Sequence, residues 1–295
     1  MQALWMVLGA FFFATMGVGV KIASQVFNTA ELVLYRGLIG MVLMALMLRT
    51  RRVSLKTPVP LMHLWRTAVG GFALAAWFYA ISALPLATAM TLNYMSGIWV
   101  AAFIVGGGLL MGNTQRNGPL IITVLMGFVG VVMTLRPTIE QNQLFAGVVG
   151  LLSGMSASLA YLQVTALGKA GEPVERTVFY FAVGTAATGV LGLMWTGFTP
   201  RDQITWEAAA WLIPIGALAS LGQWCMTRAY SRGHTLVVAS LQYSGIVFAA
   251  LYSLLLFGDQ IPLMGWAGIA LIVTSGVGAT FLRERAVPDT PAEDH

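Results

Sequence analysis

Long apolar stretches separated by short polar segments run along almost the whole chain. Most of the ten stretches that can be marked out are long enough to cross about 30 Å of hydrocarbon as helices. None shows the ten-residue alternation of apolar and polar positions that a membrane β-strand needs. The pattern therefore predicts ten transmembrane helices, approximately at Gln2–Val20, Ala30–Leu48, Ala68–Leu84, Ala87–Met111, Pro119–Leu135, Leu144–Leu167, Thr177–Trp195, Trp206–Tyr230, Leu236–Phe257 and Pro262–Leu282.

Composition supports a membrane location. Of the 295 residues, 58% are hydrophobic and 9% are charged, whereas a soluble domain carries about 25% charged residues. The net charge of +5 comes from basic residues scattered between apolar spans, which is typical of membrane-protein loops and does not indicate a nucleic-acid partner. The single Cys225 excludes an internal disulfide framework.

The distribution of basic residues predicts the orientation of the chain. If the termini are cytoplasmic, the inner segments hold twelve basic residues and the outer loops hold three, Lys21, Arg136 and Arg201. This bias predicts a multi-pass protein of the bacterial inner membrane with both termini in the cytoplasm. The inner residues are Arg49, Arg51, Arg52, Lys56, Arg66, Arg116, Lys169, Arg176, Arg228, Arg232, Arg283 and Arg285.

Short motifs occur in the same order in both halves of the chain. Asn93-Tyr94 precedes Ser96-Gly97, and Gln242-Tyr243 precedes Ser244-Gly245. Five spans in each half make the two halves enter the membrane from opposite sides, which indicates an inverted repeat with a site between the halves near the midplane. We expect a first repeat over 1–138, a second repeat over 139–284 and a disordered cytoplasmic tail over 285–295.

Three segments resemble a known family: "YRGLIGMVLMALML", "ALPLATAMTLNYMSGIWVAAFIVGGGLLMGN" and "RAYSRGHTLVVASLQYSGIVFAALYSLLLFGDQIPLMGWAGIALIVTSGVG". They are similar to the two EamA repeats of the drug/metabolite transporter superfamily. The resemblance implies an all-α polytopic membrane protein, with ten transmembrane helices arranged as two inverted five-helix repeats around a central cavity. It also implies transport of small organic solutes. The family commonly has Gly-Glu after the fourth and ninth helices, where this chain has Gly112-Asn113 and Gly258-Asp259.

Other functional classes fit the sequence less well. No His, Asp and Glu cluster lies inside a span, so we expect no enzyme, no bound metal and no cofactor. A structural membrane scaffold remains a second alternative, which a central cavity would argue against. Transporters of phosphorylated solutes need deep cations in the second half, and the seventh and ninth predicted spans contain none.

Arg36 lies inside the second predicted span, among aliphatic and small residues. A charged arginine at the centre of a membrane helix costs roughly 2.5 kcal/mol or more. Arg36 is about two turns, or 9 Å, from the start of its helix, so its side chain could extend to the membrane surface. Alternatively it faces the cavity and attracts a substrate carboxylate. The matching position of the second repeat is Phe181, which points to an asymmetric site.

Uncharged polar and aromatic side chains complete the predicted site. Amides inside hydrocarbon need partners, so their helices are expected to face each other or water. An interhelical hydrogen bond is the structural alternative for the amides, and an interfacial belt position is the alternative for the aromatics. The predicted substrate-binding residues besides Arg36 are Trp77, Tyr79, Asn93, Tyr94, Tyr161, Gln163, Tyr180, Gln223, Trp224, Gln242 and Tyr243.

The sequence thus predicts a secondary transporter that works by alternating access, as a monomer or homodimer in the bilayer. An amino acid or a derivative is the first substrate class, moved by export or facilitated exchange. An importer, such as an S-adenosylmethionine uptake carrier, is the alternative. No Asp, Glu or His falls at membrane depth, so we expect flux to follow the substrate gradient and not a proton gradient.

Overall fold

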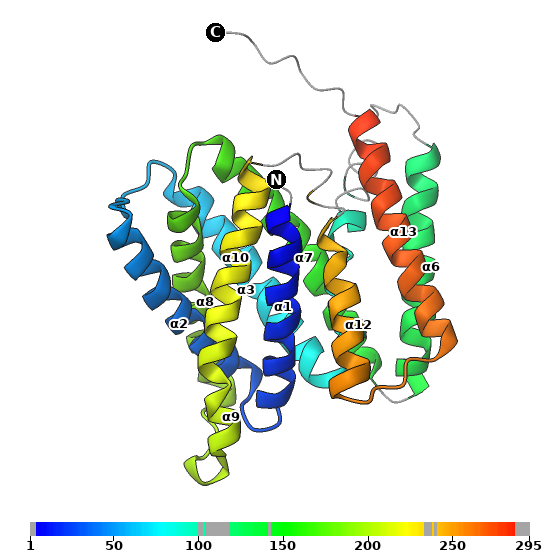
Figure 1. The fold of residues 1–295 in the computed structure, drawn as a ribbon, viewed down its shortest axis with the longest axis horizontal. Helices are drawn as coiled ribbons and strands as arrows, with labels where there is room; N and C mark the ends of the chain where they lie inside the picture. Colours follow the sequence, from blue (N-terminus) through cyan, green and yellow to red (C-terminus); the bar gives the residue numbers. More distant parts are fainter. Residues whose placement is uncertain are drawn as a thin grey trace.

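Apolar helices make up nearly all the regular structure of the computed structural model, which describes residues 4–99, 103, 118–140, 143–232, 238 and 241–286. The first half contains α1 (Leu4–Ala23), α2 (Thr29–Thr50), α3 (Pro60–Ala83), α4 (Leu86–Tyr94) and α6 (Gly118–Glu140). The second half contains α7 (Leu144–Lys169), α8 (Val174–Thr196), the 3-10 turn η1 (Arg201–Gln203), α9 (Trp206–Ala210), α10 (Leu212–Arg232), α12 (Ser244–Leu256) and α13 (Leu263–Ala286) (Figure 1).

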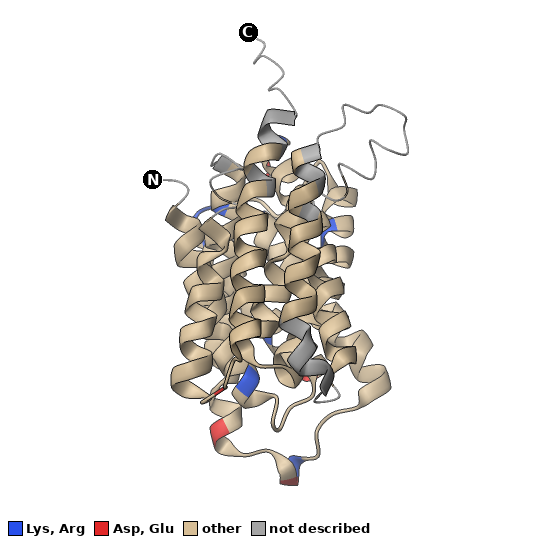
Figure 2. Ribbon diagram, turned by 90° about the vertical axis from the view of Figure 1, so that its right-hand side faces the viewer, with Lys and Arg blue, Asp and Glu red and all other residues tan. Residues whose placement is uncertain are grey.

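The helices have the length and composition of membrane spans. Within the described residues, six are long and apolar enough to cross a bilayer, and α9 with α10 form one of these. Charged positions lie mostly toward the two ends of the bundle, and most of the ribbon between them is uncharged (Figure 2). These features confirm the predicted fold class, an all-helical membrane protein with ten helices in two halves.

The bundle has two ends, which we call the N-terminal side and the far side. The N-terminal side is the end at which α1 begins, and it also carries the connections from α2 to α3 and from α7 to α8 (Figure 1). The far side is the opposite end, with the connections from α1 to α2 and from α8 to α9. On the far side, Asn28 caps α2: its side chain accepts a hydrogen bond from the Glu31 amide, and the Glu31 carboxylate accepts one from the Asn28 amide.

The packing of helices is consistent with an approximate two-fold relation between the halves. The second spans of the two halves pack along each other, as α2 against α8, and so do the fifth spans, α6 and α13. The contact of α3 with α7 has its counterpart in the contact of α10 with α1. Gly37 and Gly189 allow the close approach of α2 and α8, because a Cβ on Gly37 would lie against the Ala186 backbone and one on Gly189 against the Leu34 backbone.

The fourth and ninth spans both deviate locally from a regular helix within the repeated motifs. α4 ends at Tyr94, Met95 forms a turn, and helical backbone resumes at Ser96. In the other half, Tyr243 forms the turn that precedes α12. Met95 (φ −63°, ψ −2°) and Tyr243 (φ −65°, ψ −15°) both keep right-handed helical dihedrals, so each is a local irregularity of a helix and not an unwound segment. The Gly112-Asn113 pair and the tail beyond 286 lie outside the described residues.

The predicted start of the third span is wrong, and the error affects the site. α3 begins at Pro60, eight residues before the predicted start at Ala68. Proline suits the first helical position, because the amide that it lacks would have no intrahelical partner there. Arg66 and His63, which the sequence placed in a loop, therefore belong to the first two turns of α3 and are buried.

Candidate functional site

A small cavity of about 40 Å³ lies between the two halves of the bundle. Its walls come from α1 to α4 of the first half and from α7, α8 and α10 of the second half. A cavity of this size holds a few water molecules, so a metabolite enters only when the two halves move apart. The lining residues are Phe13, Arg36, Arg66, Gly70, Ala73, Leu74, Trp77, Asn93, Tyr94, Ala157, Ala160, Tyr161, Phe181, Gln223 and Met226.

Arg36 reaches this cavity from α2. Its residue is only 5% exposed, and its Nη1 donates to the Thr185 hydroxyl of α8 over a long 3.5 Å. Its Nε has no hydrogen-bond partner. The side chain is therefore directed into the protein interior and not toward the membrane surface, and its Nε donor is unused.

Arg66 is a second cavity arginine, which sequence reasoning assigned to a loop. It is 2% exposed, and its guanidinium carbon lies 3.9 Å from the centre of the Phe181 ring, a cation–π distance. Its Nε and Nη1 have no hydrogen-bond partner. Pro60 was the available signal, since a helix beginning there carries Arg66 in its second turn.

Five of the predicted uncharged residues line the cavity with these arginines: Trp77, Asn93, Tyr94, Tyr161 and Gln223. The Asn93 amide donates to the Ser153 hydroxyl at 3.1 Å, which joins α4 to α7. The cavity therefore combines two cations and two amides with aromatic walls, contributed by both repeats.

The remaining amides and one predicted tyrosine lie outside this lining. Gln242 is buried and connects the two halves, because its amide donates to the Ser96 hydroxyl at 2.9 Å and its oxygen accepts from Tyr230 at 2.9 Å. Tyr243 is buried at the turn before α12. Gln163 is half-buried on α7 and does not line the cavity.

The other predicted aromatics lie at the surface or near the N-terminal side. Tyr79 is 36% exposed and packs edge-on against Phe145. Trp224 donates its indole N–H to Glu175 at 3.3 Å, and Glu175 also accepts from Arg51 at 2.6 Å. The structure does not bring these side chains to the cavity.

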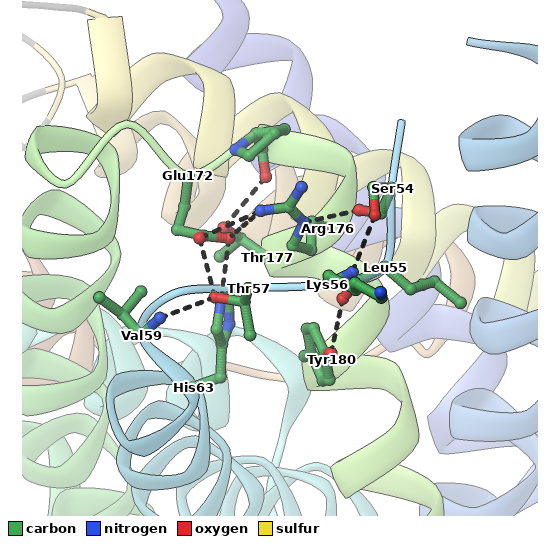
Figure 3. Close-up of polar contacts among 11 residues, drawn as sticks. Ser54, Leu55, Lys56, Thr57, Val59, His63, Glu172, Arg176, Thr177 and Tyr180 are labelled. Atoms are coloured by element: carbon green, nitrogen blue, oxygen red, sulfur yellow. Dashed lines mark hydrogen bonds and ion pairs between the residues drawn. The ribbon is translucent and has the colours of Figure 1, made fainter. Parts of the chain in front are cut away.

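Tyr180 belongs to a polar cluster that we call the loop clasp: Ser54, Thr57 and His63 of the first half with Glu172, Arg176 and Tyr180 of the second (Figure 3). The His63 ring nitrogen Nε2 lies 3.0 Å from the Glu172 carboxylate, and Thr57 donates to the same carboxylate at 2.8 Å. Arg176 donates to both Glu172 oxygens at 3.1 and 3.2 Å. The clasp therefore joins the two repeats at the N-terminal side.

The environment of Glu172 favours its ionised form. Burial by itself raises the pKa of the carboxyl, but hydrogen bonds from Thr57 and His63 and the charge of Arg176 lower it further than burial raises it. The net result is a pKa below the ordinary value of 4.5. Glu172 is therefore a carboxylate at neutral pH, and the clasp is held together by its charge.

Metal chemistry has no visible site in the described part of the chain, where no group of three His, Cys, Asp or Glu side chains could hold an ion. Acidic side chains are also absent from the described cavity lining. The arrangement is suited to binding an anionic or strongly polar small molecule through donors and aromatic surfaces.

Comparison with known proteins identifies matches along almost the whole chain. The model of the EamA-like transporter family matches residues 1–136 and 144–281. A pseudopaline exporter of Pseudomonas aeruginosa is 33% identical over 272 residues, which cover 91% of this chain and 92% of that protein. More distant matches include a riboflavin transporter of Vibrio cholerae, 26% identical over 92% of this chain and 90% of its own. An S-adenosylmethionine uptake transporter of Rickettsia bellii is 22% identical over 79% of this chain and 77% of its own.

A solved crystal structure shares the fold. It superposes with a TM-score of 0.66 at 19% sequence identity, and the match covers 97% of this chain and 98% of the other. The similarity extends through both halves, so it supports the arrangement of helices across the full bundle.

Proposed function

Because the chain belongs to the EamA-like transporter family, we propose that it moves a small organic metabolite bearing a carboxylate across the bacterial inner membrane. An amino acid or a derivative is the substrate class that we put first, carried by export or exchange. The observation that carries this proposal is the pair Arg36 and Arg66, two arginines with unused donors in one cavity built by both halves. Guanidinium groups bind carboxylates with strong, charge-assisted hydrogen bonds.

The contacts between the two halves support alternating access as the mechanism. Both repeats contribute to the cavity walls, and the loop clasp bridges them on the N-terminal side. Opening that side requires the clasp to separate, whereas opening the far side can leave it in place.

The charge of the cavity argues against the uptake alternative. S-adenosylmethionine carries a sulfonium and an ammonium cation beside one carboxylate. A cavity with two arginines and no acidic side chain in its described lining repels such a net cation. The scaffold alternative is less well supported too, because a packed scaffold has no need of a cavity with two buried charges.

We propose that both termini are cytoplasmic, which places the clasp on the cytoplasmic side. Because Arg66 belongs to α3 and not to a loop, eleven basic residues remain on the inner side against three outside. The bias of basic residues toward the inner side therefore persists. In the structure, Arg51 and Arg176 lie on the N-terminal side, and Arg201 follows the far end of α8.

A thermal-shift screen followed by liposome flux tests the proposal. The purified protein is heated with matched pairs of carboxylic acids and their methyl esters, which differ mainly in the negative charge. We expect the free acids to stabilise the protein and the best of them to show counterflow in proteoliposomes. Stabilisation and counterflow by esters or amines, with none by the acids, would contradict the proposal.

A further inference from the structure

The position of the Arg66 guanidinium in the cavity depends on a glycine of the same helix. A Cβ built on Gly70, one helical turn along α3, would overlap Arg66 Nη1 and lie 2.9 Å from the Phe181 ring. Only a residue without a side chain therefore leaves room for the guanidinium to lie back along its own helix over that ring. The position of this charge is thus determined by α3 and α8 together.

Arg36 approaches the same phenylalanine from a different helix. Its guanidinium carbon is 5.5 Å from the centre of the Phe181 ring, against 3.9 Å for Arg66. The two guanidinium carbons therefore lie no more than 9.4 Å apart, the sum of these distances. Arg36 and Arg66 belong to the first repeat and Phe181 to the second, so the cluster spans the repeat interface.

Nothing among the described residues neutralises the two charges. The ion pairs of the described chain join Arg51 to Glu175, and His63 and Arg176 to Glu172. Neither cavity arginine takes part in one. Two buried cations at this separation repel each other and have lost most of their hydration. One carboxylate can compensate one of them and leaves the other unpaired.

We infer that Arg36, Arg66 and Phe181 form a two-point anion site that selects substrates with two anionic groups, one for each guanidinium. The inference rests on the proposed function and narrows its substrate class from carboxylates to dianions. The rest of the lining includes Trp77, Tyr94 and Tyr161, so an apolar or planar body between the anionic groups finds aromatic surface to pack on.

Matched dianion and monoanion probes test this on the purified full chain. The pairs are succinate with succinamate, glutarate with glutaramate, and phthalate with phthalamate, each pair similar in size but different by one charge. Affinities come from calorimetry and thermal shift. We expect at least one dianion to bind about tenfold or more tightly than its monoamide. If no dianion binds more tightly than its monoamide, this result on the wild-type protein overturns the inference without any variant.

Two variants test whether Arg66 causes the preference for dianions. Arg66→Gln keeps donors but removes the charge, and we expect it to reduce the dianion preference to about onefold, with monoanion binding retained within about threefold. Gly70→Ala keeps the charge but displaces the guanidinium, and it should reduce the preference as well. Arg49→Gln, at the exposed end of α2, is the control. A preference unchanged in Arg66→Gln contradicts the inference.

The two proposals fail in different ways. If the protein carries monocarboxylates without a preference for dianions, the two-point site is wrong and the proposed function stands. If neither monoanions nor dianions bind or are transported, both proposals fail. Should Arg66→Gln not fold, as judged by gel filtration and circular dichroism, Gly70→Ala and the wild-type probe pairs still decide the outcome.

Discussion

The cavity and the loop clasp use the same kinds of side chain in opposite ways. In the clasp, the buried Glu172 is surrounded by Thr57, His63 and Arg176, and both of its oxygens are bonded. In the cavity, Arg36 and Arg66 are buried without a counter-charge. Charge in the clasp stabilises contact between the halves, whereas charge in the cavity remains available for a ligand.

This difference predicts that removing a charged side chain has opposite effects on stability in the clasp and in the cavity. Breaking a buried pair leaves an uncompensated charge and destabilises the folded state. Removing a buried charge that has no partner relieves a desolvation cost and should leave stability unchanged or increased. Stability and transport measured on the same variants can therefore distinguish the two regions.

The largest expected effect is on stability, from Glu172→Ala in the clasp. Loss of the carboxylate leaves His63 and Arg176 unpaired and should lower the free energy of unfolding by about 3 kcal/mol. The single Cys225, which is 2% exposed, reports unfolding when its thiol reacts with a fluorescent maleimide. Glu207→Ala, exposed on α9, is the control and should change stability by less than about 0.5 kcal/mol. If the two variants lower the free energy of unfolding equally, the clasp contributes no more to stability than an exposed surface residue.

The next largest effect concerns transport, from Arg36→Gln in the cavity. Flux of a carboxylate substrate should fall by about tenfold, because a charge-assisted hydrogen bond becomes a neutral one. Protein abundance and the midpoint of thermal unfolding should be unchanged or higher. Flux is measured by counterflow in proteoliposomes, with Arg49→Gln as the control. Normal flux, or a poorly folded variant, would instead assign Arg36 a purely structural role.

A smaller effect is the pH dependence of the clasp. Because the pKa of Glu172 lies below 4.5 in the folded protein, ionised Glu172 stabilises the fold above that pH, and the stabilisation is lost as pH falls through the folded pKa. The stability difference between wild type and Glu172→Gln should therefore be full at about pH 5 and shrink below about pH 4.5. A difference that is already lost at about pH 5 would contradict this sign. The same series on a His63→Asn background separates the contribution of the histidine.

The smallest expected effect is that of a proton gradient on transport. Among the described acids, Glu31, Glu172 and Glu175 are buried, but each lies next to a helix start near one side of the bundle and has bonded partners. We therefore expect an imposed pH gradient to change substrate accumulation by less than about twofold. Concentrative uptake that appears with the gradient and vanishes on its collapse would overturn this, and Glu31 and Asp259 would then be mutated first.

The sequence predicted some site residues well and missed others for a physical reason. Arg36, Asn93 and Tyr94 stand out because a polar group inside an apolar span is unusual wherever the chain folds. Arg66 does not stand out, since it follows a polar segment and only the start of α3 at Pro60 buries it. Tyr180 and Trp224 resemble cavity aromatics in the sequence, but their hydrogen-bond partners Leu55 and Glu175 lie on the N-terminal side.

The sequence by itself determined the membrane character, the ten helices and the division into two halves, because these depend on the apolar content of local segments. It also showed that Arg36 needs a special environment. Only the tertiary structure decided which charges are neutralised, because partners come from distant segments: His63 and Glu172 are 109 positions apart. The position of the Arg66 guanidinium likewise requires Gly70 and Phe181, which belong to different repeats. No local sequence pattern contains this contact.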